Sequence, residues 1–104
     1  MKYTHYSPDA DVVVLNDITM FEKYRENGKK ICIISKNAAD YNFDADFVYD
    51  AGKDDNEYAA RLFYLLRKAD EDGADIVFAQ IPDEKGLGIA LRNRLYKSAG
   101  GRIL

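Results

Sequence analysis

The feature that most constrains how this chain folds is a series of short apolar runs, rich in β-branched residues and bounded by polar ones. The first is "DVVVLN", and "KICIIS" and "DIVFAQ" have the same character. Apolar runs of this length are typical of strands buried on both faces, and such strands belong to parallel sheets. We therefore expect about five short strands, at residues 11–16, 30–35, 46–50, 75–80 and 101–104.

The segment after the first run predicts a short helix. Asp17 can cap it, and the apolar residues Met20, Phe21 and Tyr24 follow helical spacing. Gly28 is expected to end it, because glycine readily adopts the left-handed conformation found at helix ends.

Helical periodicity is strongest over residues 54–72. The apolar positions gather on one face, so that side is expected to pack on the sheet. Asp54, Asp55 and Glu57 at its start could be taken for a metal cluster, but acidic residues at a helix N-terminus favour capping and the helix dipole. Gly73 is expected to end this helix, and a third helix is predicted from Leu87 to Ala99.

Strands that alternate with helices predict an α/β fold. We expect three layers, α/β/α, in which a mainly parallel sheet of about five strands has about three helices on its two faces. The 104 residues, 47% of them hydrophobic, suffice for one domain with one core. Ligands of such folds bind at the carboxyl ends of the strands, so the candidate edge lies in the loops after Leu15, Ser35, Asp50 and Gln80.

Several function classes are disfavoured by the composition. No apolar stretch reaches the roughly 18 residues of a membrane span, and no signal-peptide pattern is present, so we expect a cytoplasmic protein without membrane contact. Cys32, the one cysteine, lies in an apolar run and is interpreted as a core thiol. One histidine cannot build a His-rich metal site, and neither a Walker sequence nor a recognisable nucleophile–base pair occurs. We predict no metal, cofactor or catalytic residue in this chain.

The net charge of −3 is unevenly distributed. Residues 85–104 contain five Lys and Arg and no Asp or Glu. A basic segment of this kind can contact phosphate or an acidic partner. The alternative is a solvated helix surface, because the spacing shows no aromatic interleaving of the kind found in nucleic-acid-binding segments.

The stretch "GLG", Gly86 to Gly88, follows the fourth expected strand and opens a helix. Backbone N–H groups at such a place can hold an anion. It is only a fragment of the dinucleotide-binding fingerprint, so close packing of the helix against a strand is the alternative interpretation.

Arg94 attracts attention because periodicity places it on the apolar stripe of the third helix, between Leu91 and Leu95. A charge there needs a partner. We expect it to extend its guanidinium to solvent or to pair with a carboxylate at a strand end, such as Asp50 or Asp75; the alternative is that it faces a pocket or a neighbouring domain.

Two segments of the sequence resemble a known family. "ARLFYLLRKADEDGADIVFAQIPDEKGLGIALRNRLYKSAGG" is similar to the C-terminal domain of the long-form threonylcarbamoyl-AMP synthases, the two-domain relatives of YrdC. "MKYTHYSP" resembles the linker between the two domains of that family. Together the two segments cover 50 of the 104 residues, and their order makes the resemblance specific.

The resemblance implies two parts. Residues 1–9 form an extended interdomain linker that is expected to cover the active site of a YrdC-like catalytic domain, and residues 10–104 form a Rossmann-like accessory domain without known chemistry of its own. By position, the linker residues are Lys2, Tyr3, His5, Tyr6 and Pro8. The signature of the domain itself, with a possible ligand or interface role, is Gly86, Gly88, Asn93 and Arg94.

The function is likewise implied by the resemblance. In this family the catalytic domain uses ATP, L-threonine and bicarbonate to make threonylcarbamoyl-AMP, whose threonylcarbamoyl group partner proteins pass to an adenosine beside the tRNA anticodon. That domain lies outside these 104 residues, so we expect an accessory or regulatory domain that is not an enzyme on its own. Its direct partner is the YrdC-like domain, and tRNA-modification proteins are indirect partners.

Two other function classes remain open. One is a small-ligand or nucleotide-binding module at the strand ends, and the other is a tRNA or protein interaction unit that uses the basic C-terminal helix.

Overall fold

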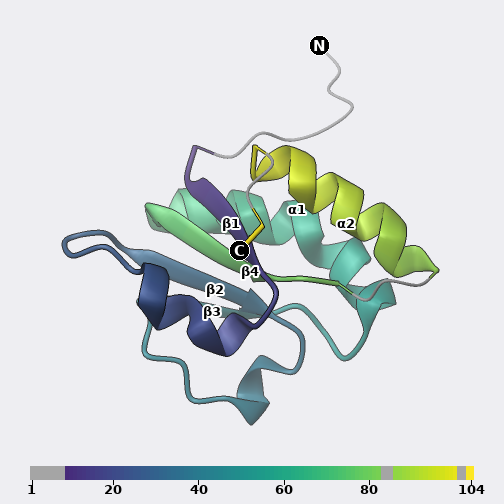
Figure 1. Cartoon of the computed structure of the whole chain (residues 1–104), viewed down its shortest axis with the longest axis horizontal. Coiled ribbons are helices and arrows are strands. Elements are labelled where there is room, and N and C mark those ends of the chain that lie inside the picture. Colours follow the sequence, from purple (N-terminus) through teal and green to yellow (C-terminus); the bar gives the residue numbers. More distant parts are fainter. Residues whose placement is uncertain (1–8, 83–85, 101–102) are drawn as a thin grey trace.

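The computed structural model describes residues 9–82, 86–100 and 103–104, and Figure 1 shows strands and helices alternating along the chain. The strands are β1 (Asp11–Leu15), β2 (Ile31–Ser35), β3 (Phe47–Asp50) and β4 (Ile76–Gln80). The helices are α1 (Asp55–Asp72) and α2 (Leu87–Ser98), with two 3-10 helices, η1 (Ile18–Tyr24) and η2 (Ala38–Asp40).

The four strands form one sheet in the order β1-β4-β2-β3, and every pair is parallel. β4 lies between β1 and β2, so that Ile76 is in register with Asp11 on one side and Ile31 on the other. β2 is buried along its whole length, whereas the outer strand β3 alternates between half-buried and exposed residues. The apolar runs predicted this correctly, because strands covered on both faces need apolar residues at every position.

Residues 101–102, half of the predicted fifth strand, lie outside the described residues. Ile103 forms only an isolated parallel bridge with Val14. The backbone N–H of Leu104 donates to the carbonyl of Val14 at 2.7 Å, and that of Asn16 donates to the carbonyl of Leu104 at 3.2 Å. Two described residues are too few for a ladder, so the C-terminal segment adds a bridge beside β1.

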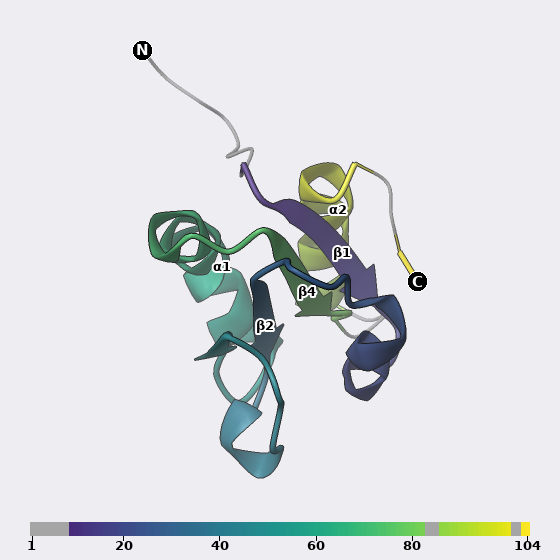
Figure 2. The same ribbon diagram turned by 90° about the vertical axis from the view of Figure 1, so that its left-hand side faces the viewer.

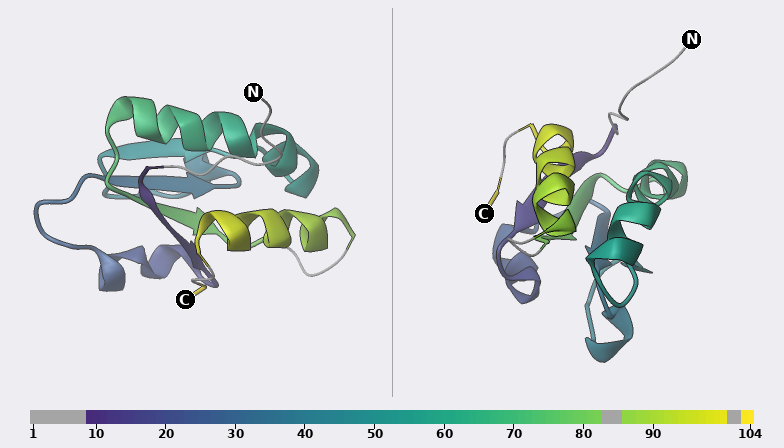
Figure 3. Two further views of the ribbon diagram at one scale, coloured as in Figure 1. Left: turned by 90° about the horizontal axis from the view of Figure 1, so that it is seen from above. Right: turned by 90° about the vertical axis from the view of Figure 1, so that its right-hand side faces the viewer.

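One face of the sheet is covered by α1 and α2, which run alongside each other (Figure 3). The apolar face predicted for α1 is confirmed, since Tyr58, Leu62, Leu65, Leu66 and Ala69 are buried. Gly73 ends α1 in the left-handed conformation, as expected, with a φ of 87°. Leu91 and Leu95 of α2 join the same core cluster.

The opposite face is covered by η1 and by the loop that carries Phe43 (Figure 2). Ile18 and Phe21 are buried there, and the ring of Phe21 lies 5.9 Å from that of Phe43 in an edge-on arrangement. Helices on the two faces give the three layers of the predicted α/β fold.

Of the details predicted for the first helix, the Asp17 cap and the buried Phe21 are confirmed, and the others are wrong. Its expected apolar positions Met20 and Tyr24 are exposed, at 41% and 38%, and the helix ends at Tyr24 instead of Gly28. The buried residues Ile18 and Phe21 are three positions apart, which matches the three-residue turn of a 3-10 helix. Asp17 does cap it, by accepting from the backbone N–H of Thr19 at 3.0 Å.

Within the described ranges, no helix is long and apolar enough to cross a bilayer.

Candidate functional site

The carboxyl ends of β2 and β4 form the candidate ligand-binding edge. Gln80, the last residue of β4, reaches across to β2, where its Oε1 accepts from the backbone N–H of Lys36 at 2.8 Å and from the hydroxyl of Ser35 at 3.4 Å. The hydroxyl of Tyr58 donates to the carbonyl of Gln80 at 2.7 Å. Burial raises the pKa of Tyr58, which keeps its hydroxyl a proton donor. These polar groups therefore bind one another.

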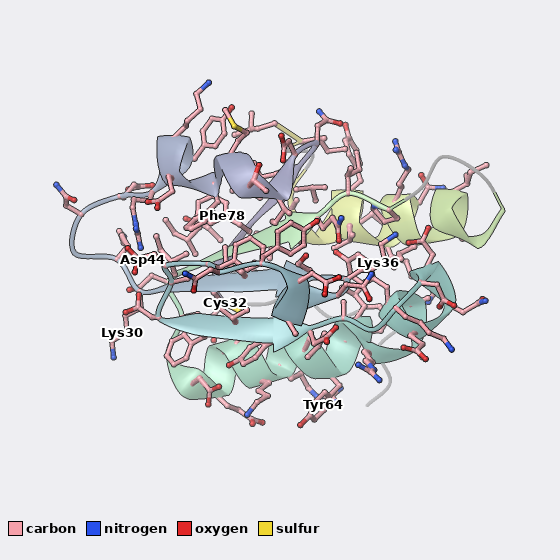
Figure 4. The ribbon with its side chains drawn as sticks, turned by 90° about the horizontal axis from the view of Figure 1, so that it is seen from below. Lys30, Cys32, Lys36, Asp44, Tyr64 and Phe78 are labelled. Carbon is pink, nitrogen blue, oxygen red and sulfur yellow. The ribbon has the colours of Figure 1, made fainter. Side chains whose placement is uncertain are left out.

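Lys36, which Figure 4 shows at the end of β2, also forms an ion pair with α1. Its Nζ lies 2.7 Å from Oδ1 of Asp55, and the two side chains are only 13% and 11% exposed. The helix dipole favours a carboxylate in the first turn of a helix, where Asp55 lies. The pair therefore ties the loop after β2 to the start of α1.

The start of α1 is closed by a reciprocal capping arrangement. Oδ1 of Asp54 accepts from the backbone N–H of Glu57 at 3.0 Å, and Oε1 of Glu57 accepts from that of Lys53 at 2.9 Å. The capping interpretation of Asp54 is thus confirmed. Among the described residues, no group of three or more His, Cys, Asp or Glu side chains could hold a metal ion.

The stretch Gly86 to Gly88 lies at the start of α2, as predicted. Gly86 is the N-cap, with a φ of 55° and no side-chain cap, while Gly88 is buried in the first turn. The preceding residues 83–85 lie outside the described ranges. An anion-binding role for these glycines stays a prediction.

Arg94 is exposed, which agrees with the expected extension of its guanidinium to solvent, although it lies at the border of the apolar stripe instead of on it. Leu91 and Leu95 are buried, but Arg94 is exposed, and its guanidinium lies over the ring of Phe63 on α1, 5.9 Å from the ring centre. A position three residues after Leu91 falls at the border of the apolar stripe, where the neighbouring helix supplies an aromatic face. The carboxylates suggested as partners accept from backbone N–H groups: Asp50 from Gly52, and Asp75 from Lys30. Asn93 is also exposed.

Cys32 is a core thiol, as predicted. It is fully buried between the sheet and α1 (Figure 4). Burial, together with the charge of Asp72, raises the pKa of Cys32 to about 12. Asp72 also accepts a hydrogen bond from the hydroxyl of Tyr49. The thiol is therefore protonated at neutral pH and is not a nucleophile.

At the amino ends of the strands, Asp70 binds the chain where it enters the domain. Its Oδ2 and Oδ1 accept from the backbone N–H groups of Asp9 and Ala10, both at 3.1 Å. These residues line a hollow of about 290 Å³ together with Asp11, Lys29 and Asp75.

The sequence interpretation missed Asp70, although a signal was present. Asp70 follows Leu66 by one helical turn and lies near the end of α1, whose last turn contains no basic residue. The helix dipole disfavours a carboxylate at this position, so an acidic residue there indicates a specific partner. The linker residues Lys2, Tyr3, His5, Tyr6 and Pro8 lie outside the described residues.

Comparison with known proteins relates this chain to one family. Residues 1–100 match the family model for "Threonylcarbamoyl-AMP synthase, C-terminal domain". The chain is 38% identical to the threonylcarbamoyl-AMP synthase of Pyrococcus abyssi and 31% identical to that of Bacillus subtilis, in each case over all of this chain and 32% of the relative.

Solved structures agree in both sequence and fold. P. abyssi Sua5 complexed with L-threonine is similar over the whole chain and 32% of its own length, with 38% identity and a TM-score of 0.82. A P. abyssi Sua5 variant, in which a histidine and the adjacent tyrosine are both alanine, is similar over 93% of this chain and 30% of its own, with 36% identity and a TM-score of 0.79.

A third structure consists of the related domain by itself. The C-terminal Sua5 domain from Pyrococcus horikoshii is 31% identical, with a TM-score of 0.69, and the match covers 94% of this chain and 98% of that one. This chain spans about a third of the length of the curated relatives it matches. It therefore belongs to the family of threonylcarbamoyl-AMP synthase C-terminal domains.

Proposed function

We propose that this chain is the accessory domain of a two-domain threonylcarbamoyl-AMP synthase, and that it regulates access to the active site of a YrdC-like catalytic domain without catalysing a reaction itself. The observation that carries the proposal is the share of its relatives' length that this chain spans. The whole chain matches relatives named as synthases, yet it spans only 32% of their length. The other two thirds of such a relative leave room for the catalytic domain.

We assign to the parent enzyme the reaction that the family resemblance implies. It uses ATP, L-threonine and bicarbonate to make threonylcarbamoyl-AMP for the threonylcarbamoyladenosine modification of tRNA. The P. abyssi structure complexed with L-threonine supports the assignment of that substrate to the parent enzyme. The present chain contributes no ligand for these compounds in our proposal.

The arrangement at the carboxyl edge of the sheet favours an accessory role. Ligands of open α/β sheets bind at this edge through side chains and helix N-termini that are available to them. Here Gln80 and Tyr58 join β4 to its neighbours, and the start of α1 is capped by Asp54. In the described part of the chain, every buried side-chain polar atom has a hydrogen-bond partner.

We place the linker residues Lys2, Tyr3, His5, Tyr6 and Pro8 over the pocket of the catalytic domain. Aromatic rings with polar tips suit this task, because they exclude water from a nucleotide site and still form hydrogen bonds. A solved P. abyssi Sua5 variant has alanine in place of a histidine and an adjacent tyrosine, and we propose that His5 and Tyr6 are the corresponding pair here. In the present chain His5 is the one histidine, and Tyr6 follows it.

The test measures threonylcarbamoyl-AMP formation by the two-domain synthase that contains these 104 residues. We expect Tyr6→Ala to lower kcat/KM by about tenfold, as the loss of one group that orders a closed site typically does. Tyr64→Ala is the matched control, because Tyr64 is 58% exposed on the outer face of α1. Equal activity of the Tyr6→Ala variant and the wild type would refute the role of the linker, and unchanged activity after removal of residues 1–104 would refute a regulatory role.

The other two function classes have tests of their own. Calorimetry of the 104-residue chain with ATP, AMP and L-threonine tests a ligand site at Gly86 to Gly88, and we expect no heat of binding. A salt-dependent mobility shift with tRNA tests whether the exposed basic side chains of Arg94 and Lys97 on α2 bind RNA.

A further inference from the structure

One carboxylate holds two consecutive backbone N–H groups at the point where the chain enters the domain. Oδ2 of Asp70 accepts from the N–H of Asp9, and Oδ1 accepts from the N–H of Ala10, both at 3.1 Å. Each oxygen therefore receives one of the two donors. This two-point contact fixes both the position and the direction of the backbone, which a single hydrogen bond would not do.

The contact lies directly before the first strand. The next backbone N–H, that of Asp11, donates to the carbonyl of Asp75 at 3.0 Å and begins the attachment to the sheet. Asp9 is exposed, while Ala10 is only 8% exposed and belongs to the core cluster. The chain thus passes from solvent to core across the two residues that Asp70 binds.

Asp70 occupies a position that is unfavourable for a carboxylate on other grounds. It lies near the C-terminal end of α1, where the partial charge of the helix is negative. Its neighbours Glu71 and Asp72 are acidic as well. Two charge-assisted hydrogen bonds to Asp9 and Ala10 offset this repulsion.

We propose that Asp70 is a positioning residue for the linker, one that fixes where and in which direction residues 1–8 leave the domain. This inference rests on the proposed function, since it gives the linker a fixed origin from which to reach a catalytic pocket. Eight residues can span at most about 28 Å, so the position and direction of the backbone at Asp9 limit which part of a catalytic domain the linker can reach.

The two-point contact makes a sharp set of variants possible. Asp70→Asn keeps the size of the side chain but offers one acceptor oxygen instead of two. Asp70→Glu keeps both oxygens on a side chain one methylene longer. Glu71→Gln removes the same charge from the adjacent position and serves as the matched control. Asp75→Asn removes the charge of a nearby carboxylate that accepts from the backbone N–H of Lys30 at 2.8 Å.

The first measurement is amide hydrogen exchange of the 104-residue chain. In Asp70→Asn we expect exchange at Asp9 and Ala10 to accelerate by about tenfold, the effect of losing one hydrogen bond. Asp70→Glu should recover most of the protection, and Glu71→Gln should leave it unchanged. Equal exchange in Asp70→Asn and the wild type, or equal acceleration in Glu71→Gln, would overturn the proposal.

The second measurement is synthase activity of the two-domain enzyme. We expect Asp70→Asn to raise KM severalfold with little change in kcat, and Asp70→Glu to restore KM. Unchanged KM despite accelerated exchange at Ala10 would overturn the positioning role. Failure of the proposed function is a separate result, because it would appear as unchanged activity in Tyr6→Ala whatever the behaviour of Asp70.

Discussion

The connection between β3 and α1 allows a quantitative test of how tightly this part of the structure is packed. Gly52 is buried with a φ of +102°, and a Cβ added there would lie 2.3 Å from the Cβ of Glu57 and 2.5 Å from its Oε1. The carbonyl of Gly52 also accepts from the backbone N–H of Asn37 at 2.8 Å, so the loop cannot move away without losing that bond. We therefore expect Gly52→Ala to combine backbone strain with a steric clash.

The expected loss can be divided into these two contributions. A side chain at positive φ costs about 1–2 kcal/mol, and overpacking costs about 1–3 kcal/mol. Gly52→Ala should thus lower the free energy of unfolding by about 3 kcal/mol. Gly73→Ala isolates the first contribution, because Gly73 has a φ of +87° and nothing within 4 Å of an added Cβ. Its expected loss is about 1 kcal/mol.

Urea unfolding followed by circular dichroism measures both variants against the wild type. A loss of about 3 kcal/mol is a large fraction of the stability of a domain of this size, so the midpoint should move clearly. Equal losses in Gly52→Ala and Gly73→Ala would refute the steric argument. The same result would show that Glu57 moves aside at negligible cost.

Three further predictions concern the core and the helix surface. The pKa of Cys32 is raised from 9.0 to about 12, so the thiol of the unfolded chain ionises first as the pH rises. We therefore expect the free energy of unfolding to fall between pH 9 and 12, and to fall less steeply in Cys32→Ala. Urea unfolding at several pH values measures both. Asp55→Ala should destabilise the domain by about 3 kcal/mol, because it leaves the ammonium of Lys36 nearly buried without this partner; a smaller loss in the double variant Lys36→Met/Asp55→Ala would confirm the coupling. Arg94→Ala should cost less than about 1 kcal/mol in thermal unfolding, since its contact with Phe63 is at an exposed site, and a larger loss would contradict the exposed placement.

Much of the fold could be predicted from the sequence because its signals are local. β-branched runs such as Val12 to Val14 predict buried strands whatever their position in the sheet. The apolar face of α1 follows from a period of 3.6 residues. The cap at Asp54 was equally predictable, since its hydrogen bond joins residues three positions apart.

The errors arose where distant segments decide the outcome. Arg94 was placed on the apolar stripe by its spacing, but the ring of Phe63, which belongs to a different helix, determines where its guanidinium lies. The partners of Asp70 are separated from it by 60 and 61 residues in sequence, so its contacts could not be read from local patterns. The first helix is 3-10 because only Ile18 and Phe21 meet the sheet, and a short segment carries too few residues to distinguish the two helical periods.

The strand order has a consequence for how the chain acquires its structure. β1 and β2 do not pair with each other; each pairs with β4, which begins 65 residues after the start of β1. During synthesis β1 and β2 cannot pair with β4 until α1 and then β4 have emerged from the ribosome. Because closing such long loops is slow, folding should be late and highly cooperative, and a nascent chain that stops before Ile76 should remain unfolded.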